Sequence, residues 1–465
     1  MVRYARTAML GFVAIAWAVI VACEAPPTAA PTTGTEPIAD DPAHNVYIPP
    51  RTELTRQMQV AVVYNDEQIQ FRYEVPTEAP SWYHQYLVYE DGEWVRYGDA
   101  PVGPHGQGLY EDRVATMIDD GAIEGFETYG GHLTMHPGIR GRSDAVDPEQ
   151  VEQHPWLGQQ LGRSDVRKFI PDSREGEPEA EDFWSQVRDG ESITALREAG
   201  TFIDSIQWRA HRSNPIGYGD NGYVLEYRHS SEGRGMYTDN WDEETEQPLM
   251  MFDEQAAGLR ALRLETLLRR GYGQDDPYYL YEGDAVAFDP DHDWQEGDAI
   301  PQRLLRQPEG SRGSIRGSGH WSDGAWHVRM TRPLEPIDAT DSKRFEHGEQ
   351  YHIALATHLR ASGGRWHYAS MPLTLGLGTE AMIEAKRTDG DLDEAEVPWT
   401  QVPLYYPGQV TYAEIRDEDR TIHHRYMQAL GNRLEPQFVQ DLAEAIVAHE
   451  LDMLRRKGLR EDGDN

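Results

Sequence analysis

A run of side chains capable of binding iron lies near the end of the β-rich part of the chain: His352, His358, His367 and Met371. Residues 351–358 and 366–373 are apolar and aromatic segments, and the turn at 360–364 between them predicts an antiparallel hairpin. In the second segment, Ala369 and Met371 alternate onto the face of His367. A neutral imidazole and a thioether on one face could line a haem pocket. The alternative is that His367 is a half-buried residue of the sheet.

A second group, Arg209, His211 and Arg212, follows an apolar segment at 202–209 that we predict to be a strand. The two arginines could pair with the propionate carboxylates of a cofactor through charge-assisted hydrogen bonds. The alternative is a rim histidine between two solvated arginines.

The third group contains His132 and His136, which are four residues apart, a spacing that metal sites on helices use. The adjacent Gly130-Gly131 and Pro137-Gly138 favour a turn over a helix. We therefore expect His132 and His136 to have a structural or supporting role.

The elements that must position these groups are mostly short strands. Residues 59–64 and 68–75 predict a hairpin across Asn65-Asp66, and residues 326–331 predict a further strand. Residues 109–118 have helical apolar spacing, and 230–320 form a long loop-rich stretch. The fold class predicted is mainly β, an antiparallel β-sandwich with helical and loop-rich insertions.

A helix is expected at the C-terminal end, from Pro436 to Lys457, with Gly458 able to stop it. The expected organisation is a β-sandwich domain over 47–412 and a C-terminal helical extension over 413–465. No phosphate-binding, hydrolase or calcium-binding loop motif is evident.

Composition limits the possible chemistry. The chain has 43 basic and 80 acidic residues, and its net charge of −37 argues against nucleic acid as a partner. The acid is spread along the chain and lysines are few, which is typical of proteins from salt-loving hosts. There is one cysteine, Cys23, and no CxxCH motif, so a covalently attached c-type haem is not expected.

The N-terminus predicts a signal peptide over residues 1–22. Arg3 and Arg6 precede about fifteen apolar or small residues, too few to cross a bilayer core of ~30 Å comfortably. The segment 20–23, Ile-Val-Ala-Cys, resembles the lipobox of bacterial lipoproteins, which implies a lipid on Cys23. Residues 23–46 are rich in Pro, Thr and Ala and predict a flexible tether. We expect a lipoprotein facing the periplasm, with the outer membrane the preferred location.

Several segments resemble proteins related to ethylbenzene dehydrogenase. These are the Tyr-Glu-Asp-Arg-Val-Ala run at 110–115, Trp-Arg-Ala at 208–210, the strand at 326–334 and the hairpin at 358–373. The resemblance is to the haem-binding γ subunit of that enzyme and to related subunits of molybdoenzymes, and it covers roughly residues 50–410. It implies a β-sandwich that holds one b-type haem without covalent attachment.

The resemblance also implies iron ligands. Those subunits use a methionine and a lysine, but the lysine position falls on or near His367, and no lysine lies in this hairpin. We therefore predict His367 and His211 as the iron ligands, with His358 and Met330 in reserve. Arg209 and Arg212 complete the predicted haem site.

The function predicted from sequence is an envelope lipoprotein that binds haem b and transfers electrons to or from a partner enzyme or a soluble carrier. On this basis we expect an electron-transfer protein or subunit and not a stand-alone catalyst. The alternative is a β-sandwich lipoprotein without redox chemistry that binds a small ligand or another envelope protein.

Overall fold

The computed structural model describes residues 48–98, 103–104, 109–136, 146–166, 168–180, 182–362 and 367–456. The predicted signal peptide, the tether and Cys23 lie outside these residues. The described residues belong to one compact unit.

The main sheet has thirteen strands, most of them antiparallel. Along its path the order is β19-β20-β2-β1-β25-β24-β21-β6-β7-β8-β9, and β23 and β26 bridge β21 and β1. The strand bounds are β1 Thr55–Tyr64, β2 Gln68–Pro76, β6 Arg113–Asp119, β7 Ile203–Arg209, β8 Asp220–Val224, β9 Arg228–Ser230, β19 Arg316–Ser322, β20 Ala325–Pro333, β21 Gln350–His358, β23 Tyr368–Ser370, β24 Leu373–Leu377, β25 Ile383–Arg387 and β26 Thr400–Tyr405.

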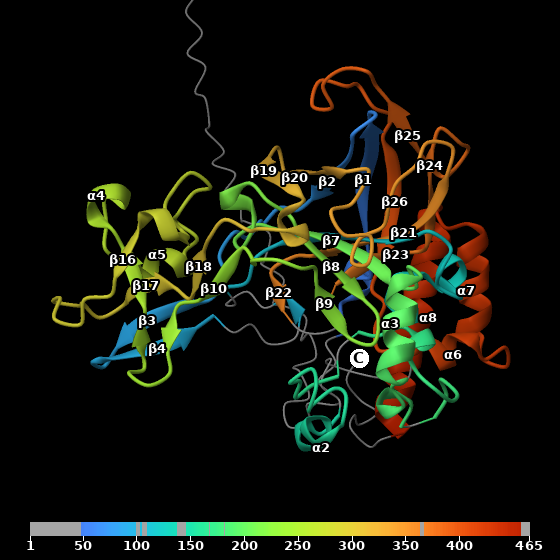
Figure 1. Cartoon of the computed structure of the whole chain (residues 1–465), viewed down its shortest axis with the longest axis horizontal. Coiled ribbons are helices and arrows are strands. Elements are labelled where there is room, and N and C mark those ends of the chain that lie inside the picture. Colours follow the sequence, from blue (N-terminus) through green and yellow to red (C-terminus); the bar gives the residue numbers. More distant parts are fainter. Residues whose placement is uncertain are drawn as a thin grey trace, which may run out of the picture. The chain divides into compact units, whose positions relative to one another are not determined.

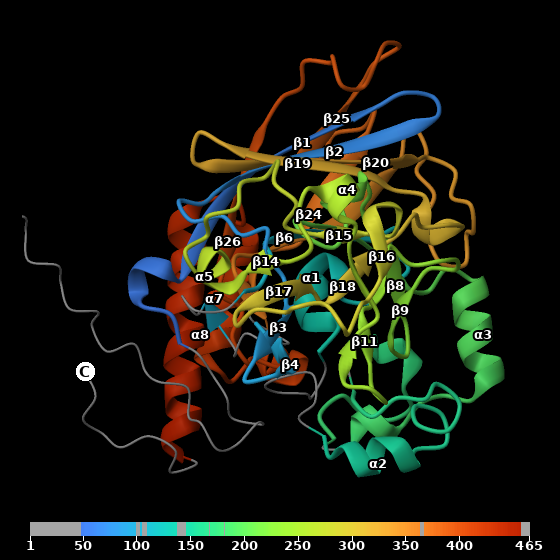
Figure 2. The same cartoon turned by 90° about the vertical axis from the view of Figure 1, so that its left-hand side faces the viewer.

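The sheet folds into two layers that share one core. Figure 2 shows β1, β2, β19 and β20 side by side as one layer. Tyr73 on β2 hydrogen-bonds Thr116 on β6 (2.6 Å), although β2 and β6 are not neighbours in the sheet. The rings of Trp208 on β7 and Trp326 on β20 lie 5.0 Å apart. These contacts cross from one layer to the other, and the predicted mainly β, sandwich-type fold is confirmed.

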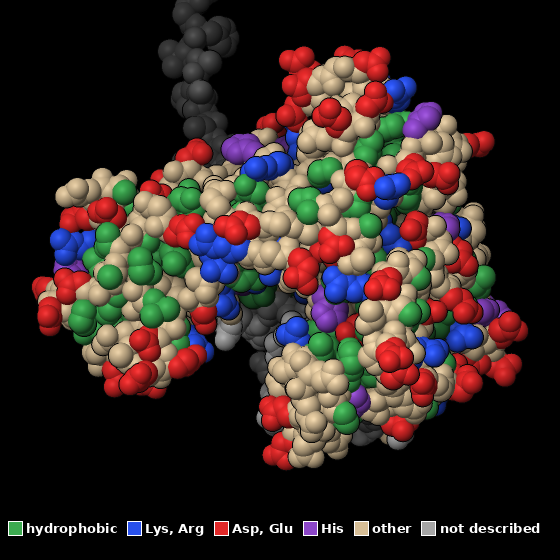
Figure 3. Space-filling model, in the orientation of Figure 1, with side chains coloured by type: hydrophobic (Ala, Val, Ile, Leu, Met, Phe, Trp, Pro, Cys, Tyr) green, Lys and Arg blue, Asp and Glu red, His purple; other side chains and the backbone are tan. Residues whose placement is uncertain are grey.

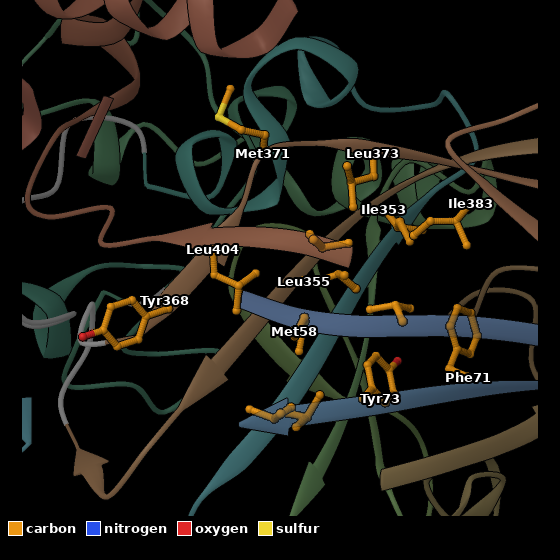
Figure 4. Packing of buried hydrophobic residues seen from close by; sticks show 14 of the residues in the cluster. Met58, Phe71, Tyr73, Ile353, Leu355, Tyr368, Met371, Leu373, Ile383 and Leu404 are labelled. Carbon is orange, nitrogen blue, oxygen red and sulfur yellow. The ribbon is translucent and has the colours of Figure 1, made fainter. Parts of the chain in front are cut away.

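Alternating burial explains why these segments are strands. In β20, Trp326, Val328 and Met330 are buried, while His327 and Arg329 are exposed. Figure 4 shows the core between the layers, where Phe71 and Tyr73 of β2 lie close to Leu355 of β21. One face of each strand is therefore occupied by the core, and the other face is available for a site.

A second lobe surrounds its own apolar cluster, which includes Tyr86, Leu87, Trp94, Phe252 and Trp294. This lobe contains most of the stretch expected to be loop-rich, which instead carries many short elements. Their bounds are β3 Tyr86–Glu90, β4 Glu93–Tyr97, β10 Tyr237–Asp239, β11 Trp241–Asp242, β12 Gln247–Pro248, β13 Met250–Phe252, α4 Glu254–Ala257, β14 Leu262–Arg263, α5 Leu264–Leu268, β15 Leu280–Tyr281, β16 Ala285–Ala287, β17 Asp298–Pro301 and β18 Arg303–Leu305.

The helices pack around the sandwich, and α1 lies over the outer face of β21. Their bounds are α1 Phe126–Thr134, α2 Pro148–Gln153, α3 Gly190–Glu198, α6 Tyr412–Arg416, α7 Thr421–Gly431 and α8 Pro436–Arg456. The expected C-terminal helix is confirmed as α8, which packs with α7 against β26 (Figure 1). In the described part of the chain, no helix combines the length and apolar character needed to cross a bilayer.

Three local predictions are wrong. Residues 113–119 form β6 and not a helix, because Val114, Thr116 and Ile118 are β-branched and alternate into the core. The segment 366–373 is not one strand, since the described residues break at Met371-Pro372 between β23 and β24. The turn expected at His132 is part of α1.

A buried ion pair between the layers gives the first prediction. Arg332 on β20 bonds Asp204 on β7 (2.6 Å), and Asp204 also accepts from the backbone N–H of Lys343. Asp204→Ala leaves a buried guanidinium without its counter-charge, so we expect the free energy of unfolding in urea to fall by about 3–5 kcal/mol. The exposed Asp66–Arg387 pair is the control, and Asp66→Ala should cost less than about 1 kcal/mol. Equal effects of the two variants would contradict the structural role given to the buried pair.

Candidate functional site

The site lies on the face of β21 that points away from the sandwich core. Ile353 and Leu355 enter the core, whereas Ala354, Ala356 and His358 take the opposite face. Because β6 pairs with β21 throughout, Arg113, Ala115 and Met117 share that outer face. In the predicted hairpin strand, His358 therefore lies on the face of β21 that points away from the core.

Three alanines form a flat floor across three neighbouring strands. Ala356 on β21 pairs with Ala115 on β6 and with Ala369 on β23. Ala354 extends the floor by one row beside Met117. Methyl side chains leave a hollow that larger residues would fill, so a flat apolar group could lie on this surface.

Helix α1 approaches the floor closely because of its two glycines. Gly130 breaks the helix with a φ of 67°, a conformation that glycine adopts without strain. A Cβ on Gly131 would lie 2.5 Å from the Met117 sulfur. The glycine pair thus brings His132 and Met135 over β6 and β21.

Four buried histidines adjoin the floor in a continuous series. The Nδ1 of His132 and the Nε2 of His367 are hydrogen-bonded at 2.9 Å. The ring of His136 lies 5.0 Å from that of His132, and the ring of His358 stacks on that of His367 at 4.8 Å with 27° between planes. We call His132, His136, His358 and His367 the histidine cluster.

The charge state of His358 suits metal binding. Burial lowers its pKa well below the usual value, and Arg113, His367, Lys168 and Arg228 lower it further. Its imidazole is therefore neutral near pH 7, as a metal ligand requires. Its Nδ1 is buried without a hydrogen-bond partner among the described residues.

A narrow cavity of about 20 Å³ lies between the floor and α1. Its lining combines the alanines Ala115, Ala354, Ala356 and Ala369 with Met117, His132, Met135, Leu355 and His367. This volume is far below the roughly 300–1,000 Å³ of small-molecule pockets, so a bulky ligand would enter only if α1 and the floor moved apart. Ala356 and Met117 are only half-buried, so the cavity is open along one edge.

The structure places His211 in a different cluster from His367. The Nδ1 of His211 bonds the Trp82 carbonyl oxygen at 3.0 Å, and its ring lies 5.9 Å from that of His84 and 5.8 Å from that of Tyr278. This contact with a carbonyl fixes the proton on Nδ1. Of the two predicted iron ligands, only His367 lies at the cavity.

The other predicted haem residues already have partners or lie elsewhere. Arg209 pairs with Asp220 and Arg212 with Glu111, all in buried surroundings. Met330 is fully buried in the sandwich core on β20. Their contact with haem stays a prediction, and nothing in the described residues brings Met330 to the cavity lining.

Met371 and His352 also fall outside the cavity lining. Met371 is fully buried in the core and points towards the helices (Figure 4). It leaves the face of His367 because the strand ends at Ser370. His352 lies on the outer face of β21, with its Nδ1 4.0 Å from Asp119.

Neither the alanine floor nor Arg113 was predicted from the sequence, and the contact of His132 with His367 was not expected. Alternation in 351–358 would have put Ala354 and Ala356 on the face of His358. The assignment of 109–118 as a helix hid the pairing of Arg113 and Ala115 with that face. The contact of His132 with His367 spans 235 positions of sequence, and no local pattern signals it.

Among the described residues, no three His, Cys, Asp or Glu side chains are arranged to hold a metal ion. A structural zinc site, which needs four protein ligands, is therefore not formed by this part of the chain. A cofactor whose metal takes only one or two protein ligands places no such demand.

Fold and site together define a β-sandwich protein with a buried imidazole cluster beside an apolar floor. The family model described as ethylbenzene dehydrogenase matches residues 14–370. The match covers more than half of the chain, so the chain belongs to the ethylbenzene dehydrogenase family. It includes α1, β6, β21 and β23, which carry the whole histidine cluster. A comparison with curated proteins found no match.

Membership of this family corrects one expectation. From the sequence we expected an electron-transfer protein and not a catalyst. The family is that of a dehydrogenase, which is an enzyme, so the expectation that the chain is not an enzyme is wrong.

The buried His211 predicts a pH dependence of stability. Its pKa is lowered from 6.5 to about 4, chiefly by burial. As the pH falls below 6.5, only the unfolded chain takes up this proton, so folding is progressively disfavoured until the pH reaches about 4. Between about pH 7.5 and pH 5 this should cost about 2 kcal/mol of unfolding free energy.

His211→Gln keeps a donor for the Trp82 carbonyl but cannot titrate. The variant should therefore lose about 2 kcal/mol less than the wild type over this pH range in urea unfolding. The exposed His424→Gln serves as control and should behave as the wild type. Identical pH slopes for His211→Gln and wild type would show that His211 is not buried and neutral.

Proposed function

We propose that this chain holds one b-type haem on the alanine floor and that it carries electrons for an ethylbenzene dehydrogenase-type reaction. The iron would be bound by a ring of the His132–His367 pair. The observation that carries the proposal is this hydrogen-bonded, buried imidazole pair at the rim of a flat apolar cavity.

The donor set fits a haem. Haem iron needs one or two protein ligands, and imidazole and thioether are both used. The cavity lining offers His132 and His367 as imidazoles and Met117 and Met135 as thioethers. Because a cavity of about 20 Å³ is far smaller than a macrocycle, haem would enter only with displacement of α1 from the floor, along the edge at the half-buried Ala356 and Met117.

Haem b, when bound, can take up and release one electron. The role of the chain is to fix the geometry around it. The hydrogen bond between His132 and His367 orients both rings and sets which nitrogen carries the proton, as outer partners do for metal-bound histidines. Neutral His358 stacks on His367 and restricts its rotation.

Arg113 supplies a positive charge beside the histidine cluster that could bind a haem carboxylate. It lies opposite His358 on β6, and its guanidinium donates to the Ala361 carbonyl oxygen at 2.8 Å. In the described residues it forms no ion pair with a carboxylate, whereas Arg209 and Arg212 do. Arg113 is therefore placed to bind a propionate, a role that we predicted for the other two.

The haem proposal is tested by the absorption spectrum of the purified full-length chain after addition of ferric haem b. We expect a Soret band that shifts on reduction with dithionite. His367→Ala should abolish or shift the band, and loss of the partner in His132→Ala should weaken haem affinity by about 10–100-fold. His424→Ala on α7 is the matched control and should bind haem as the wild type does.

A second variant separates the cavity from its ligands. Ala356→Phe fills the floor at a half-buried position, so the fold should survive while haem binding is lost. No haem complex of the wild type, or equal spectra for wild type, His367→Ala and Ala356→Phe, would refute the proposal. That outcome would favour a β-sandwich that binds another ligand or an envelope protein.

We further propose that the chain works as a periplasm-facing lipoprotein anchored through Cys23, with a redox enzyme or a soluble carrier as its partner. The support is the segment Ile20-Val21-Ala22-Cys23 and the tether after it. Cys23→Ser should abolish labelling of the expressed chain by radioactive palmitate and release the protein from the membrane fraction. Palmitate incorporation into Cys23→Ser would contradict the anchor.

A further inference from the structure

A second concentration of buried nitrogen atoms lies beside the histidine cluster, and the haem proposal uses only one of its residues, Arg113. It is built on β6, β7, β8 and β18 and on the segment before β3. Its members are His84, Tyr110, Glu111, Arg113, Arg209, His211, Arg212, Asp220, Tyr237, Arg303 and Arg312. We call this group the arginine centre.

Positive charge exceeds negative charge in the arginine centre. Asp220 is shared by Arg209 and Arg312, Glu111 is paired with Arg212, and Asp239 lies 3.1 Å from Arg303. Arg113 has no carboxylate partner among the described residues. Five guanidinium groups thus face three carboxylates, in a chain whose net charge is −37.

The molecular surface shows the same contrast between a local excess of positive charge and a chain of negative net charge. Figure 3 shows Lys and Arg side chains gathered over β10 and β18, while Asp and Glu side chains are spread over much of the remaining visible face. The excess of positive charge is therefore local. A field of this sign draws in anions.

Hydrogen-bond donors in the arginine centre also exceed acceptors. The Nε atoms of Arg113, Arg209 and Arg303 are buried without a hydrogen-bond partner among the described residues. Both ring nitrogens of neutral His84 and the Nε2 of His211 also lack a hydrogen-bond partner. Because the His211 proton is on Nδ1, only His84 adds a further donor to the three Nε–H groups. His84 and His211 are fully buried and Arg209 is 4% exposed. Buried donors left without acceptors are rare in native proteins and point to a missing ion, water or ligand.

Two half-buried phenols lie in the same positive field. Burial alone would raise the pKa of Tyr110 and Tyr237, yet both values are lowered. The cause in each case is the guanidinium of Arg212, joined by Arg113 at Tyr110 and by Arg209 at Tyr237. The guanidinium carbon of Arg212 lies 5.9 Å from the centre of the Tyr110 ring and 5.4 Å from that of the Tyr237 ring.

We propose that the arginine centre binds a small oxyanion, a carboxylate or a phosphate, at the unpartnered Nε–H donors of Arg113, Arg209 and Arg303. An oxyanion supplies several acceptor atoms and negative charge in one compact group. It would therefore provide both the missing hydrogen-bond acceptors and the missing negative charge. Water would supply acceptors but would leave the excess charge in place. The anion has two possible sources, a free solute or the carboxylates of a haem bound nearby.

The test uses the haem-free full chain, with inorganic phosphate and succinate as probes in isothermal titration calorimetry. Binding would lower the local positive potential, so the phenolate absorbance of Tyr110 and Tyr237 at mildly alkaline pH should fall with each probe. The double variant Tyr110→Phe, Tyr237→Phe should lose this optical change.

Arg113→Gln is the informative substitution, because it leaves no buried carboxylate without a partner. Losing one charge-assisted hydrogen bond should weaken affinity for the probes by about tenfold. Arg329→Gln is the matched control, since Arg329 is an exposed strand arginine paired with Asp393, and its affinity should be unchanged. If Arg113→Gln does not fold, Arg303→Gln replaces it.

The source of the anion follows from repeating the titration on haem-loaded protein. Retained binding identifies a free solute, whereas binding lost on haem loading identifies the haem carboxylates as the natural occupant. No binding of either probe by the haem-free wild type would overturn the proposal. Equal affinities of Arg113→Gln, Arg303→Gln and Arg329→Gln would also overturn it, because they would reveal general charge screening.

Discussion

The pairing of β6 between β21 and β7 is the constraint on which both buried clusters depend. Arg113 lies opposite His358 on one side and opposite Arg209 on the other. This register places the histidine cluster and the arginine centre at the same end of the sheet, two strands apart. A slip of one residue would turn Ala115 and Arg113 into the core and remove both.

Contacts across the sandwich core stabilise this strand register. Tyr73 of β2 bonds Thr116 of β6, and Arg332 of β20 bonds Asp204 of β7, so each outer-face strand is tied through its inner face to the opposite layer. The outer face can therefore contain charged and polar residues that would destabilise an apolar core. Buried charge and unpaired donors are costly, and their concentration outside the core at one sheet end makes this region the candidate functional site.

Much of the sandwich followed from local pattern, because alternation is clear in 68–75 and 326–331 and the apolar runs at 59–64 and 351–358 have strand length. The C-terminal helix followed from its apolar stripe and its proline and glycine boundaries. The helix predicted at 109–118 is a strand in the structure. The apolar residues of this segment suit both a helix and a strand, and the pairing with β21 and β7 selects the strand. The second lobe has strands of two to five residues, which leave little periodic signal.

The site was less predictable than the fold. His358 and His367 were found from their place in a hairpin, but His132 was set aside because Gly130-Gly131 reads as a turn. Here the same glycines allow α1 to reach the sheet, where a larger residue would strike Met117. His211 lies in the turn after β7, and its side chain faces Trp82, His84 and Tyr278, a grouping that depends on the segment before β3.

The measurement that bears most directly on the proposed function is electron–nuclear double resonance of the ferric haem-loaded chain, grown with ¹⁵N-histidine. If a ring of the His132–His367 pair binds the iron, the spectrum should contain a strongly coupled ¹⁵N signal that disappears in His367→Ala or His132→Ala. A spectrum with no coupling to labelled histidine would contradict histidine ligation.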